Sequence, residues 1–257
     1  MKQLESIAQS FYQFFTTGVF HPEIDDISQL SLEDAYACQR HFIKKRREAG
    51  NDTVGYKVGC TSAAVQEQFG ITQPIYGRLA TPGIIAEGEP VVAADYYDLA
   101  IEPEFVITLG RDLETSQLTD DELLDCIDNV RAGIELHNYR YHYSSPSIQE
   151  LICSNGIHAS LIVGGETSSP HLVDWEMEGV AVFINGCLVA SGVAADIMGG
   201  PLHSLRFLLR HLESRGEVLQ AGEMVIPGSA TPLIHVNSGD QVICRFANLG
   251  KVETTFG

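Results

Sequence analysis

The stretch IEPEFVITLG, residues 101–110, has the pattern of a buried strand that also carries two glutamates. Residues such as Ile101 and Phe105 favour strands. Glu102 and Glu104 are separated by one residue, so on a strand both side chains point to the same face, with Cα atoms about 7 Å apart. Two carboxylates held this close repel each other, and a cation, a shared proton or open water must relieve the repulsion.

Pro103 lies between the two glutamates and points to the opposite face. A proline has no N–H group to donate to a neighbouring strand. Its position therefore predicts an edge strand or a bulge at this point of the sheet.

Further strands are predicted from about residue 80 onward, where short runs of β-forming residues dominate the sequence. These runs cover 84–86, 132–137, 160–163, 180–184, 187–193, 223–226 and 241–246. Asn185 and Gly186 separate two of the runs, which predicts a hairpin.

Helices are predicted mainly before residue 50. Ser31 is the expected N-cap of a helix that stops at Gly50. A T-x-x-E capping box at 119–122 predicts a helix over 118–130, and Pro201 is expected in the first turn of another. The sequence thus predicts an α+β fold, with a mainly helical subdomain over residues 1–80 and a β-rich catalytic domain over 81–257.

Composition excludes several classes of protein. The content of 44% hydrophobic and 19% charged residues is typical of a folded globular chain. The formal net charge of −18 argues against a nucleic-acid partner. We expect no membrane association, because no apolar run reaches roughly 18 residues, and a cytoplasmic location, because the N-terminus has no apolar signal core. The six cysteines form no C-x-x-C pair, so we expect reduced thiols rather than a zinc site.

A third carboxylate, Glu135, lies within the strand-like run AGIELHNYR, residues 132–140. Three carboxylates with directions set by strands can hold a hard cation, and Mg²⁺ and Mn²⁺ prefer such oxygen ligands. The alternative is that each glutamate is simply exposed on a half-solvated sheet.

Lys57 has apolar neighbours in GYKVG, so burial could lower its pKa and suit it for proton transfer. The alternative is a surface lysine with a partly buried stem. His137, His142 and His158 lie in or beside apolar runs, and each alone fits a hydrogen-bonded structural histidine better than a catalyst.

The segment PGSATP, residues 227–232, could present the Ser229 side chain or backbone N–H groups to an anion. By itself it also fits an ordinary turn.

Several longer segments follow one another in a recognisable order. They are GYKVGCTS (55–62), YGRL (76–79), IEPEFVITLGRDL (101–113), AGIELHNYR (132–140), SNGIHASLIVGG (154–165), NGCLVASGVAADIMGGPLHSLRFLLRHL (185–212) and LQAGEMVIPGSATP (219–232). Together they resemble the 2-hydroxypenta-2,4-dienoate hydratase and 4-oxalocrotonate decarboxylase group of the fumarylacetoacetate hydrolase superfamily.

This resemblance implies a larger mixed β-sheet roll of the fumarylacetoacetate hydrolase C-terminal type. It implies that Glu102, Glu104 and Glu135 hold Mg²⁺ or Mn²⁺ and that Lys57 lies at the substrate. The implied activity is a metal-dependent hydratase, a lyase, in which the metal chelates a small 2-oxo acid and stabilises an enolate. The alternatives are a decarboxylase or C–C hydrolase of the same superfamily, and a non-catalytic partner subunit of an active paralogue. A homo-oligomer, with possible association with a related decarboxylase, is also implied.

Three departures from the group's pattern predict an altered substrate, with lost activity as the alternative. Asn138, Tyr139 and Arg140 replace an Asp-Ser-Arg run. Residues 154–158 replace D-N-x-S-S, which puts Ile157 and His158 where paired serines are typical, and Pro227 replaces the Thr of a T-G-[ST] turn.

We expect Lys57 and His158 to be catalytic and Arg140, Asn155 and Ser229 to bind substrate. Acidic surroundings are expected to favour the protonated form of His158. It would then pair with a second substrate carboxylate or act as a general acid; the alternative is that it fills space and bonds Asn155 or Tyr139.

Overall fold

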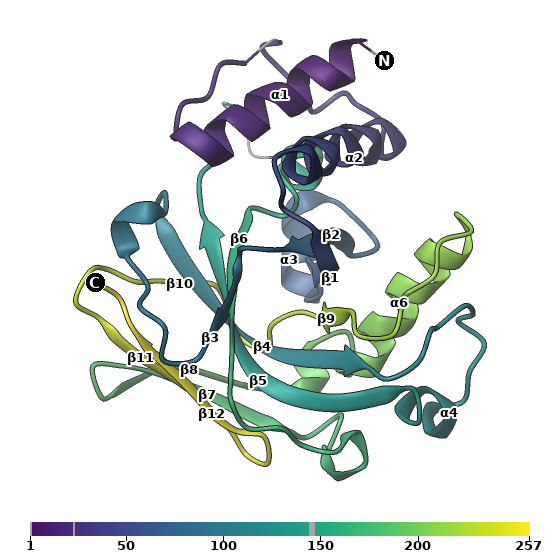
Figure 1. The fold of residues 1–257 in the computed structure, drawn as a ribbon, viewed down its shortest axis with the longest axis vertical. Helices are drawn as coiled ribbons and strands as arrows, with labels where there is room; N and C mark the ends of the chain where they lie inside the picture. Colours follow the sequence, from purple (N-terminus) through teal and green to yellow (C-terminus); the bar gives the residue numbers. More distant parts are fainter. Residues whose placement is uncertain (1, 23, 144–146) are drawn as a thin grey trace.

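Helices gather near the N-terminus and strands dominate the rest of the chain, which the computed structural model describes at residues 2–22, 24–143 and 147–257 (Figure 1). The α-helices are α1 (Lys2–Thr17), α2 (Leu32–Glu48), α3 (Ala63–Phe69), α4 (Asp120–Leu124), α5 (Ile148–Cys153) and α6 (Pro201–Glu213). Short 3-10 helices are η1 (Ala93–Asp95), η2 (Pro170–Leu172) and η3 (Ala194–Asp196). The strands are β1 (Thr53–Gly59), β2 (Ile75–Ala80), β3 (Ile84–Ala86), β4 (Leu99–Leu109), β5 (Ile127–Asn138), β6 (His158–Val163), β7 (Gly179–Ile184), β8 (Cys187–Val193), β9 (Met224–Ile226), β10 (Ile234–His235), β11 (Gln241–Phe246) and β12 (Gly250–Thr255).

The larger sheet has eight strands and curls into a half-barrel (Figure 1). Its order is β2-β1-β9-β4-β5-β6-β3, and β10 pairs with β4 off this path. The pairs β1–β9 and β3–β6 are parallel, whereas β4–β5 and β5–β6 are antiparallel. This mixed, curled sheet confirms the predicted α+β fold with a β roll.

A second sheet, in the order β12-β11-β7-β8, packs against the convex side of the first, where β11 and β12 contact β5. Phe105 of β4 meets Phe246 of β11 in this interface, with ring centroids 5.2 Å apart and planes at 80°. Asn185 and Gly186 join β7 to β8 with positive φ angles of 52° and 80°, so the predicted hairpin is confirmed.

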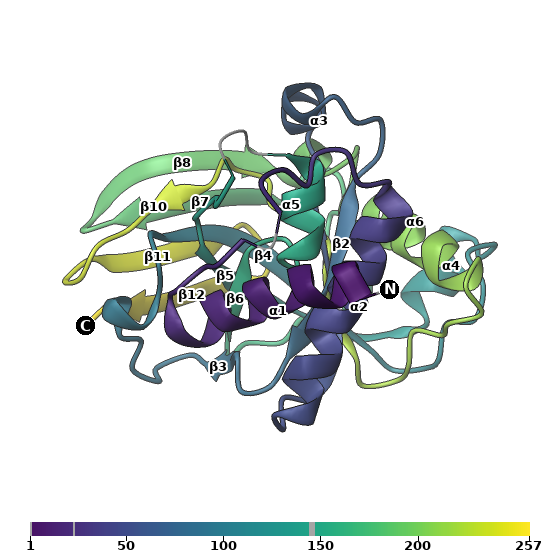
Figure 2. The same cartoon turned by 90° about the horizontal axis from the view of Figure 1, so that it is seen from above.

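Helices α1, α2 and α5 pack together on the open side of the half-barrel (Figures 1 and 2). The predicted N-cap of α2 is confirmed, because the Ser31 side chain accepts a hydrogen bond from the Asp34 backbone. Tyr36 of α2 stacks on Tyr76 of β2, with ring centroids 4.6 Å apart, and this contact fastens the helical layer to the sheet. Among the described residues, no helix is both long and apolar enough to cross a membrane.

Two local predictions are corrected. The capping box at Thr119 is present, but the helix predicted over 118–130 ends at Leu124, and β5 begins at Ile127. Ile127 and Val130 are buried in the core, so tertiary packing determines this segment more than its helical pattern does. β4 is an interior strand rather than an edge. Its side opposite β5 carries ladders at residues 100–101 and 107–108 and an isolated bridge from Glu104 to Ser229, and Pro103 lies in the gap beside this bridge.

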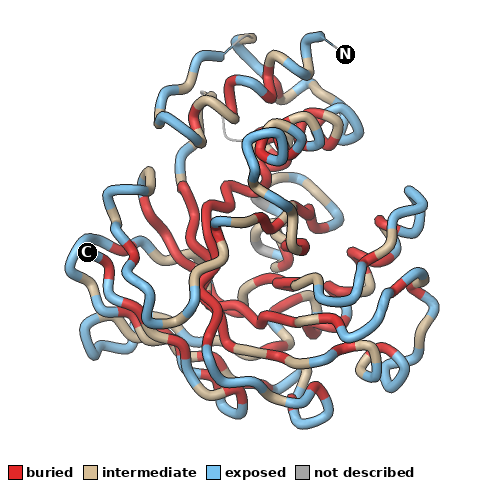
Figure 3. Tube along the Cα trace, viewed as in Figure 1, coloured by how far each residue is buried: buried red, intermediate tan, exposed pale blue. Residues whose placement is uncertain are grey.

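The predicted domain boundary between residues 80 and 81 falls between β2 and β3, and both strands belong to the eight-stranded sheet. The ladder that joins β1 to β9 also connects the two parts. The division into two domains therefore stays a prediction. Burial is continuous along β6 and over residues 132–138 of β5, and nearly so along β4, at the centre of the molecule (Figure 3), so both faces of the sheet are covered there.

Candidate metal centre

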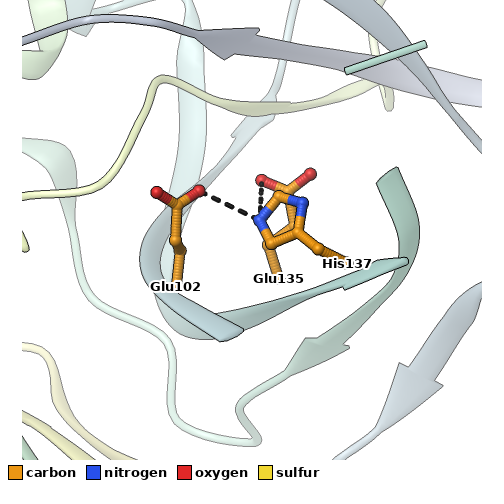
Figure 4. A group of neighbouring side chains, drawn as sticks. All are labelled: Glu102, Glu135 and His137. Atoms are coloured by element: carbon orange, nitrogen blue, oxygen red, sulfur yellow. Dashed lines mark hydrogen bonds and ion pairs between the residues drawn. The ribbon is translucent and has the colours of Figure 1, made fainter. Parts of the chain in front are cut away.

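The β4–β5 register places the acidic side chains on one face of the sheet. Glu102 pairs with Glu135 across the ladder, Glu104 pairs with Gly133, and Ala100 pairs with His137. Residues paired in this way share a face, as do alternate residues along one strand. The three glutamates and His137 therefore share one face, opposite the face of Phe105 that packs on the second sheet, and we call it the concave face. Figure 4 shows Glu102, Glu135 and His137 side by side on it.

Glu104 is buried, and one of its oxygens has no hydrogen-bond partner. Its Oε2 accepts a hydrogen bond of 3.1 Å from the backbone N–H of Gly228, whereas Oε1 has none among the described residues. Burial, followed by repulsion from Glu135 and Glu102, raises the pKa of Glu104 well above its usual range. A side chain at position 228 would lie 2.6 Å from Thr61, and its φ of 118° also favours glycine. The 227–232 turn thus donates a backbone N–H group to the Glu104 carboxyl, and its role toward an anionic substrate stays a prediction.

Glu135 contacts two basic side chains on the concave face. Its Oε1 is 2.8 Å from Lys57 Nζ and 2.8 Å from His158 Nδ1, although both groups come from other strands. Burial raises the pKa of Glu135, but attraction to Lys57 and His137 and the hydrogen bond from His158 outweigh it. The pKa is therefore held below its usual range.

Two expectations about protonation are wrong. Desolvation lowers the pKa of the buried Lys57, but attraction to Glu135, Glu102 and Glu104 outweighs it, so the pKa is raised rather than lowered. For His158 desolvation wins over the hydrogen bond to Glu135, and its pKa is lowered rather than held high. The acidic surroundings therefore keep Lys57 charged, whereas burial favours a neutral His158.

His137 also belongs to this cluster, although its sequence context favours a structural histidine. Its Nε2 is 3.0 Å from Glu102 Oε2 and 3.6 Å from Glu135 Oε2, and the ring is 2% exposed (Figure 4). One ligand atom each from Glu102, Glu135 and His137 lie within 4.8 Å of one another. The sequence does contain a signal for this position of His137. It follows Glu135 by two residues on a strand, so the two side chains share one face.

The donor set fits a divalent cation. Glu104 Oε1 and Glu135 Oε2 are buried oxygens without hydrogen-bond partners in the described part of the chain. Three carboxylates face one ammonium group, and such repulsion favours an added cation. Carboxylate oxygens are the ligands that Mg²⁺ and Mn²⁺ prefer.

The side chain of Asn155 does not face the cluster. Its Oδ1 accepts from Arg78 N at 2.8 Å and its Nδ2 donates to Arg78 O at 2.9 Å, so both polar atoms hold β2. The predicted contact of Asn155 with substrate stays a prediction. These hydrogen bonds also fix the neighbouring Gly156, whose carbonyl accepts a 3.3 Å hydrogen bond from Lys57 Nζ. Asn155 thus helps to place the lysine.

The other two predicted substrate ligands lie at the margins of the site. Arg140 is half-exposed and its Nε donates to Asp98 Oδ2 at 2.8 Å. The hydroxyl of Ser229 accepts a hydrogen bond from the Thr231 backbone, and a backbone bridge joins Ser229 to Glu104. Both roles stay predictions.

A small pocket lies beside His158. Its volume is about 20 Å³, and it is lined in part by Phe11, Phe14, Phe15, Phe42 and Arg140 as well as by His158 itself. A volume of this size holds about one water molecule. His158 is not hydrogen-bonded to Asn155 or Tyr139, and its Nε2 has no partner among the described residues. The ring therefore separates Glu135 from this pocket.

Comparison with known proteins agrees with this geometry. Residues 59–257 match the family described as fumarylacetoacetate (FAA) hydrolase C-terminal. The chain belongs to the fumarylacetoacetate hydrolase family. The resemblance seen in the sequence is thereby confirmed.

Two relatives of known name align with almost the whole chain. A 2-keto-4-pentenoate hydratase from Paraburkholderia xenovorans is 30% identical over 256 residues, which cover 99% of this chain and 95% of the relative. A TodF product hydratase from Pseudomonas putida is 33% identical over 250 residues, which cover 97% and 93%.

A solved structure of a relative has the same fold throughout. The 4-oxalocrotonate decarboxylase from Pseudomonas putida G7, complexed with magnesium and adipate, superposes with a TM-score of 0.93 at 28% identity. The match covers 100% of this chain and 98% of the decarboxylase. Both the helical N-terminal part and the β roll are therefore shared with this family member.

Proposed function

We propose that this family member is a divalent-metal-dependent hydro-lyase that acts on a small 2-hydroxydienoate or 2-oxo acid. Glu102, Glu104 and Glu135 would hold Mg²⁺ or Mn²⁺. Such an ion polarises the paired carboxylate and ketone oxygens of a 2-oxo acid and stabilises the enolate formed at the neighbouring carbon. The observation that carries the proposal is the convergence of Lys57 and His158 on one oxygen of Glu135, beside the two other glutamates.

Lys57 is suited to hold and deliver a proton at Nζ. The ammonium is buried, bonds Glu135 Oε1 and Gly156 O, and has a raised pKa, so it carries its proton at neutral pH. Neutralising the surrounding acids would weaken the attraction that holds this proton and make its release easier. Lys57 would then protonate the dienol carbon while the enol O–H proton leaves to solvent, which gives the ketone. It would next take a proton from the water that adds to the alkene and return it to the carbon beside the ketone, and solvent would recharge the lysine.

His158 is suited to orient rather than to protonate. Its Nδ1 donates to Glu135 Oε1, so in the neutral ring Nε2 is an acceptor. A water in the adjacent pocket would contact this residue. We propose that His158 fixes the Glu135 carboxylate for Lys57 and narrows the space available to the substrate.

Substituting His158 tests the hypothesis that this chain acts on a substrate different from that of its relatives. Replacing His158 with serine enlarges the space beside Glu135 and removes one donor. If His158 determines specificity, His158→Ser gains activity on simple 2-hydroxydienoates and loses it on bulkier acids or diacids. Unchanged activity on both sets, with stability preserved, would leave only a space-filling role.

A decarboxylase is the second candidate, because the structural match described above is to a 4-oxalocrotonate decarboxylase over the whole chain. The same metal and lysine would serve, since loss of CO₂ beside a ketone also needs the enolate to be stabilised. A C–C hydrolase or a non-catalytic partner of an active paralogue remains a further alternative. From the resemblance alone, we also propose a cytoplasmic homo-oligomer that can associate with a related decarboxylase.

Assaying the purified chain with Mg²⁺ or Mn²⁺ on a panel of 2-hydroxydienoates, 4-oxalocrotonate and acylpyruvates tests the proposal. We expect metal-dependent loss of the dienol absorbance with water addition and without release of CO₂. Glu135→Gln should abolish it, and Glu253→Gln, at a surface ion pair with Lys251, should not. Release of CO₂ would favour the decarboxylase, and binding of metal without any turnover would favour the non-catalytic subunit.

A further inference from the structure

We propose that His137 supplies a nitrogen ligand to the divalent ion, so that the site prefers a first-row transition ion such as Mn²⁺ to Mg²⁺. This inference rests on the proposed function, because it assumes that the concave face binds a metal. It adds a ligand of a different chemical class to the three glutamates.

The distances around His137 are those of ligands that share one ion. Nε2 lies 3.0 Å from Glu102 Oε2 and 3.6 Å from Glu135 Oε2. Adjacent ligands of an octahedral ion with bonds of about 2.1 Å lie about 3.0 Å apart. An ion that bridged these two carboxylates would therefore come within bonding reach of the ring nitrogen.

The surroundings of His137 leave its ring free to bind in this way. The ring is 2% exposed, and Ala100, which pairs with it on β4, has too short a side chain to occupy the space above the acids. Nε2 is 3.0 Å from Glu102 Oε2, and a cation held between the two atoms would replace this contact. Nδ1 has no partner among the described residues, so it can carry the ring proton without losing a hydrogen bond.

A second observation indicates that a cation is missing from the cluster. Glu135 Oε2, which faces His137, and Glu104 Oε1 are both buried without hydrogen-bond partners in the described residues. Buried carboxylate oxygens ordinarily have such partners, and their absence points to a missing cation. Strand β5 thus places the unpaired Glu135 Oε2 beside the ring nitrogen of His137, and the unpaired Glu104 Oε1 lies on the same face of the sheet.

The chemistry of the nitrogen determines the preference. Imidazole is a good ligand for first-row transition ions, whereas Mg²⁺ is bound almost entirely by oxygen. Three carboxylates alone would accept Mg²⁺, Ca²⁺ or Mn²⁺ with little discrimination by ligand type. Adding one nitrogen ligand shifts the balance toward Mn²⁺ or Fe²⁺.

The test uses three proteins: wild type, His137→Gln and His142→Gln. Glutamine offers an oxygen at a similar reach. His142 is a half-buried control, because it stacks on Phe20 with ring centroids 4.0 Å apart and is not hydrogen-bonded to the acidic cluster. Calorimetry measures the dissociation constants of Mn²⁺ and Mg²⁺, and pulsed electron paramagnetic resonance of bound Mn²⁺ detects coupling to a ligating nitrogen. Circular dichroism verifies that each variant is folded.

We expect nitrogen coupling in wild type and His142→Gln and its loss in His137→Gln. The preference for Mn²⁺ over Mg²⁺ should fall about tenfold or more in His137→Gln alone, as for other residues that tune a metal site. Mn²⁺ binding without nitrogen coupling, or an unchanged preference in folded His137→Gln, would overturn the role of His137 and leave the proposed function intact. Failure of wild type to bind either ion would contradict the proposed function itself.

Discussion

At the centre of strands β4 and β5 both faces carry fully buried side chains, and the two faces are chemically opposite. Phe105 and Ile134 on the convex face are 1% and 0% exposed, and Glu104 and Glu135 on the concave face are also 1% and 0% exposed. On the convex face burial removes apolar area from water and stabilises the fold. On the concave face burial separates carboxylates from water, which costs free energy unless a charge or a hydrogen bond compensates. Burial alone therefore does not distinguish a residue that stabilises from one that functions.

Two buried glutamates of the concave face, Glu135 and Glu104, differ in their pKa values. Glu135 is compensated by Lys57 and His158 and has a lowered pKa, whereas Glu104 has one backbone donor and a raised pKa. The difference follows from the partners, since the two side chains are buried alike. Glu104 is thus the acid that gains most from an added cation.

Removing Lys57 should have the largest effect. Lys57→Met takes away the group that holds the proton, and loss of a general acid–base residue lowers turnover about 10²–10⁴-fold. Steady-state kinetics with saturating metal measures this. Lys44→Met, at an exposed pair with Glu48, is the matched control and should keep wild-type turnover. Retained turnover in Lys57→Met would assign catalysis to another residue.

Truncation on the convex face should instead lower stability. Phe105→Ala leaves a cavity beside Phe246, and changes of this kind cost about 3–5 kcal/mol of the free energy of unfolding. Denaturant unfolding measures it. Turnover per folded molecule should stay close to wild type, because Phe105 does not face the acids. A loss of metal binding in the folded fraction would show that the two faces are not independent.

Added metal should stabilise the wild-type protein. At a concentration of about 100 times its dissociation constant, a ligand that binds only the folded state adds about 2.7 kcal/mol. Thermal unfolding with and without Mn²⁺ or with a chelator measures the gain. Glu102→Gln removes a proposed ligand and should lose most of it. An equal gain in Glu102→Gln would place the ion elsewhere.

The smallest effect concerns the pH dependence of the metal-free protein. Because folding raises the pKa of Glu104 above its ordinary value near 4.5, ionising this group opposes folding. Its contribution to stability is present below that pH and is lost as pH rises through the folded pKa. Glu104→Gln should therefore reduce the decline in stability between about pH 5 and pH 8, measured by denaturant unfolding in chelator. An unchanged slope would mean that Glu104 is not the strained acid.

Local patterns in the sequence predicted many of the strands and turns and the directions of their side chains. The alternation in IEPEFVITLG placed Glu102 and Glu104 on one face of β4, and Asn185–Gly186 predicted the β7–β8 turn. Both depend on neighbouring residues only. The helix predicted beyond Leu124 was wrong, because the burial of Ile127 depends on residues that are distant in the sequence.

The properties of the site depended on partners that no local pattern reveals. The charge state of Lys57 follows from Glu135, 78 residues later in the chain. The position of His137 beside Glu102 follows from the β4–β5 register. Asn155 was expected at the substrate, yet its amide is occupied by the Arg78 backbone, a contact that only the folded chain forms.

The central claim is that the concave acids hold a divalent ion that in turn binds a 2-oxo acid. Calorimetric titration of Mn²⁺ with and without pyruvate, in wild type and Glu135→Gln, tests it most directly. The account predicts that pyruvate tightens Mn²⁺ binding to wild type and that Mn²⁺ tightens pyruvate binding by the same factor, as linkage requires. It predicts no such coupling in Glu135→Gln. Pyruvate binding that is independent of Mn²⁺, or coupling that survives in Glu135→Gln, would contradict the account.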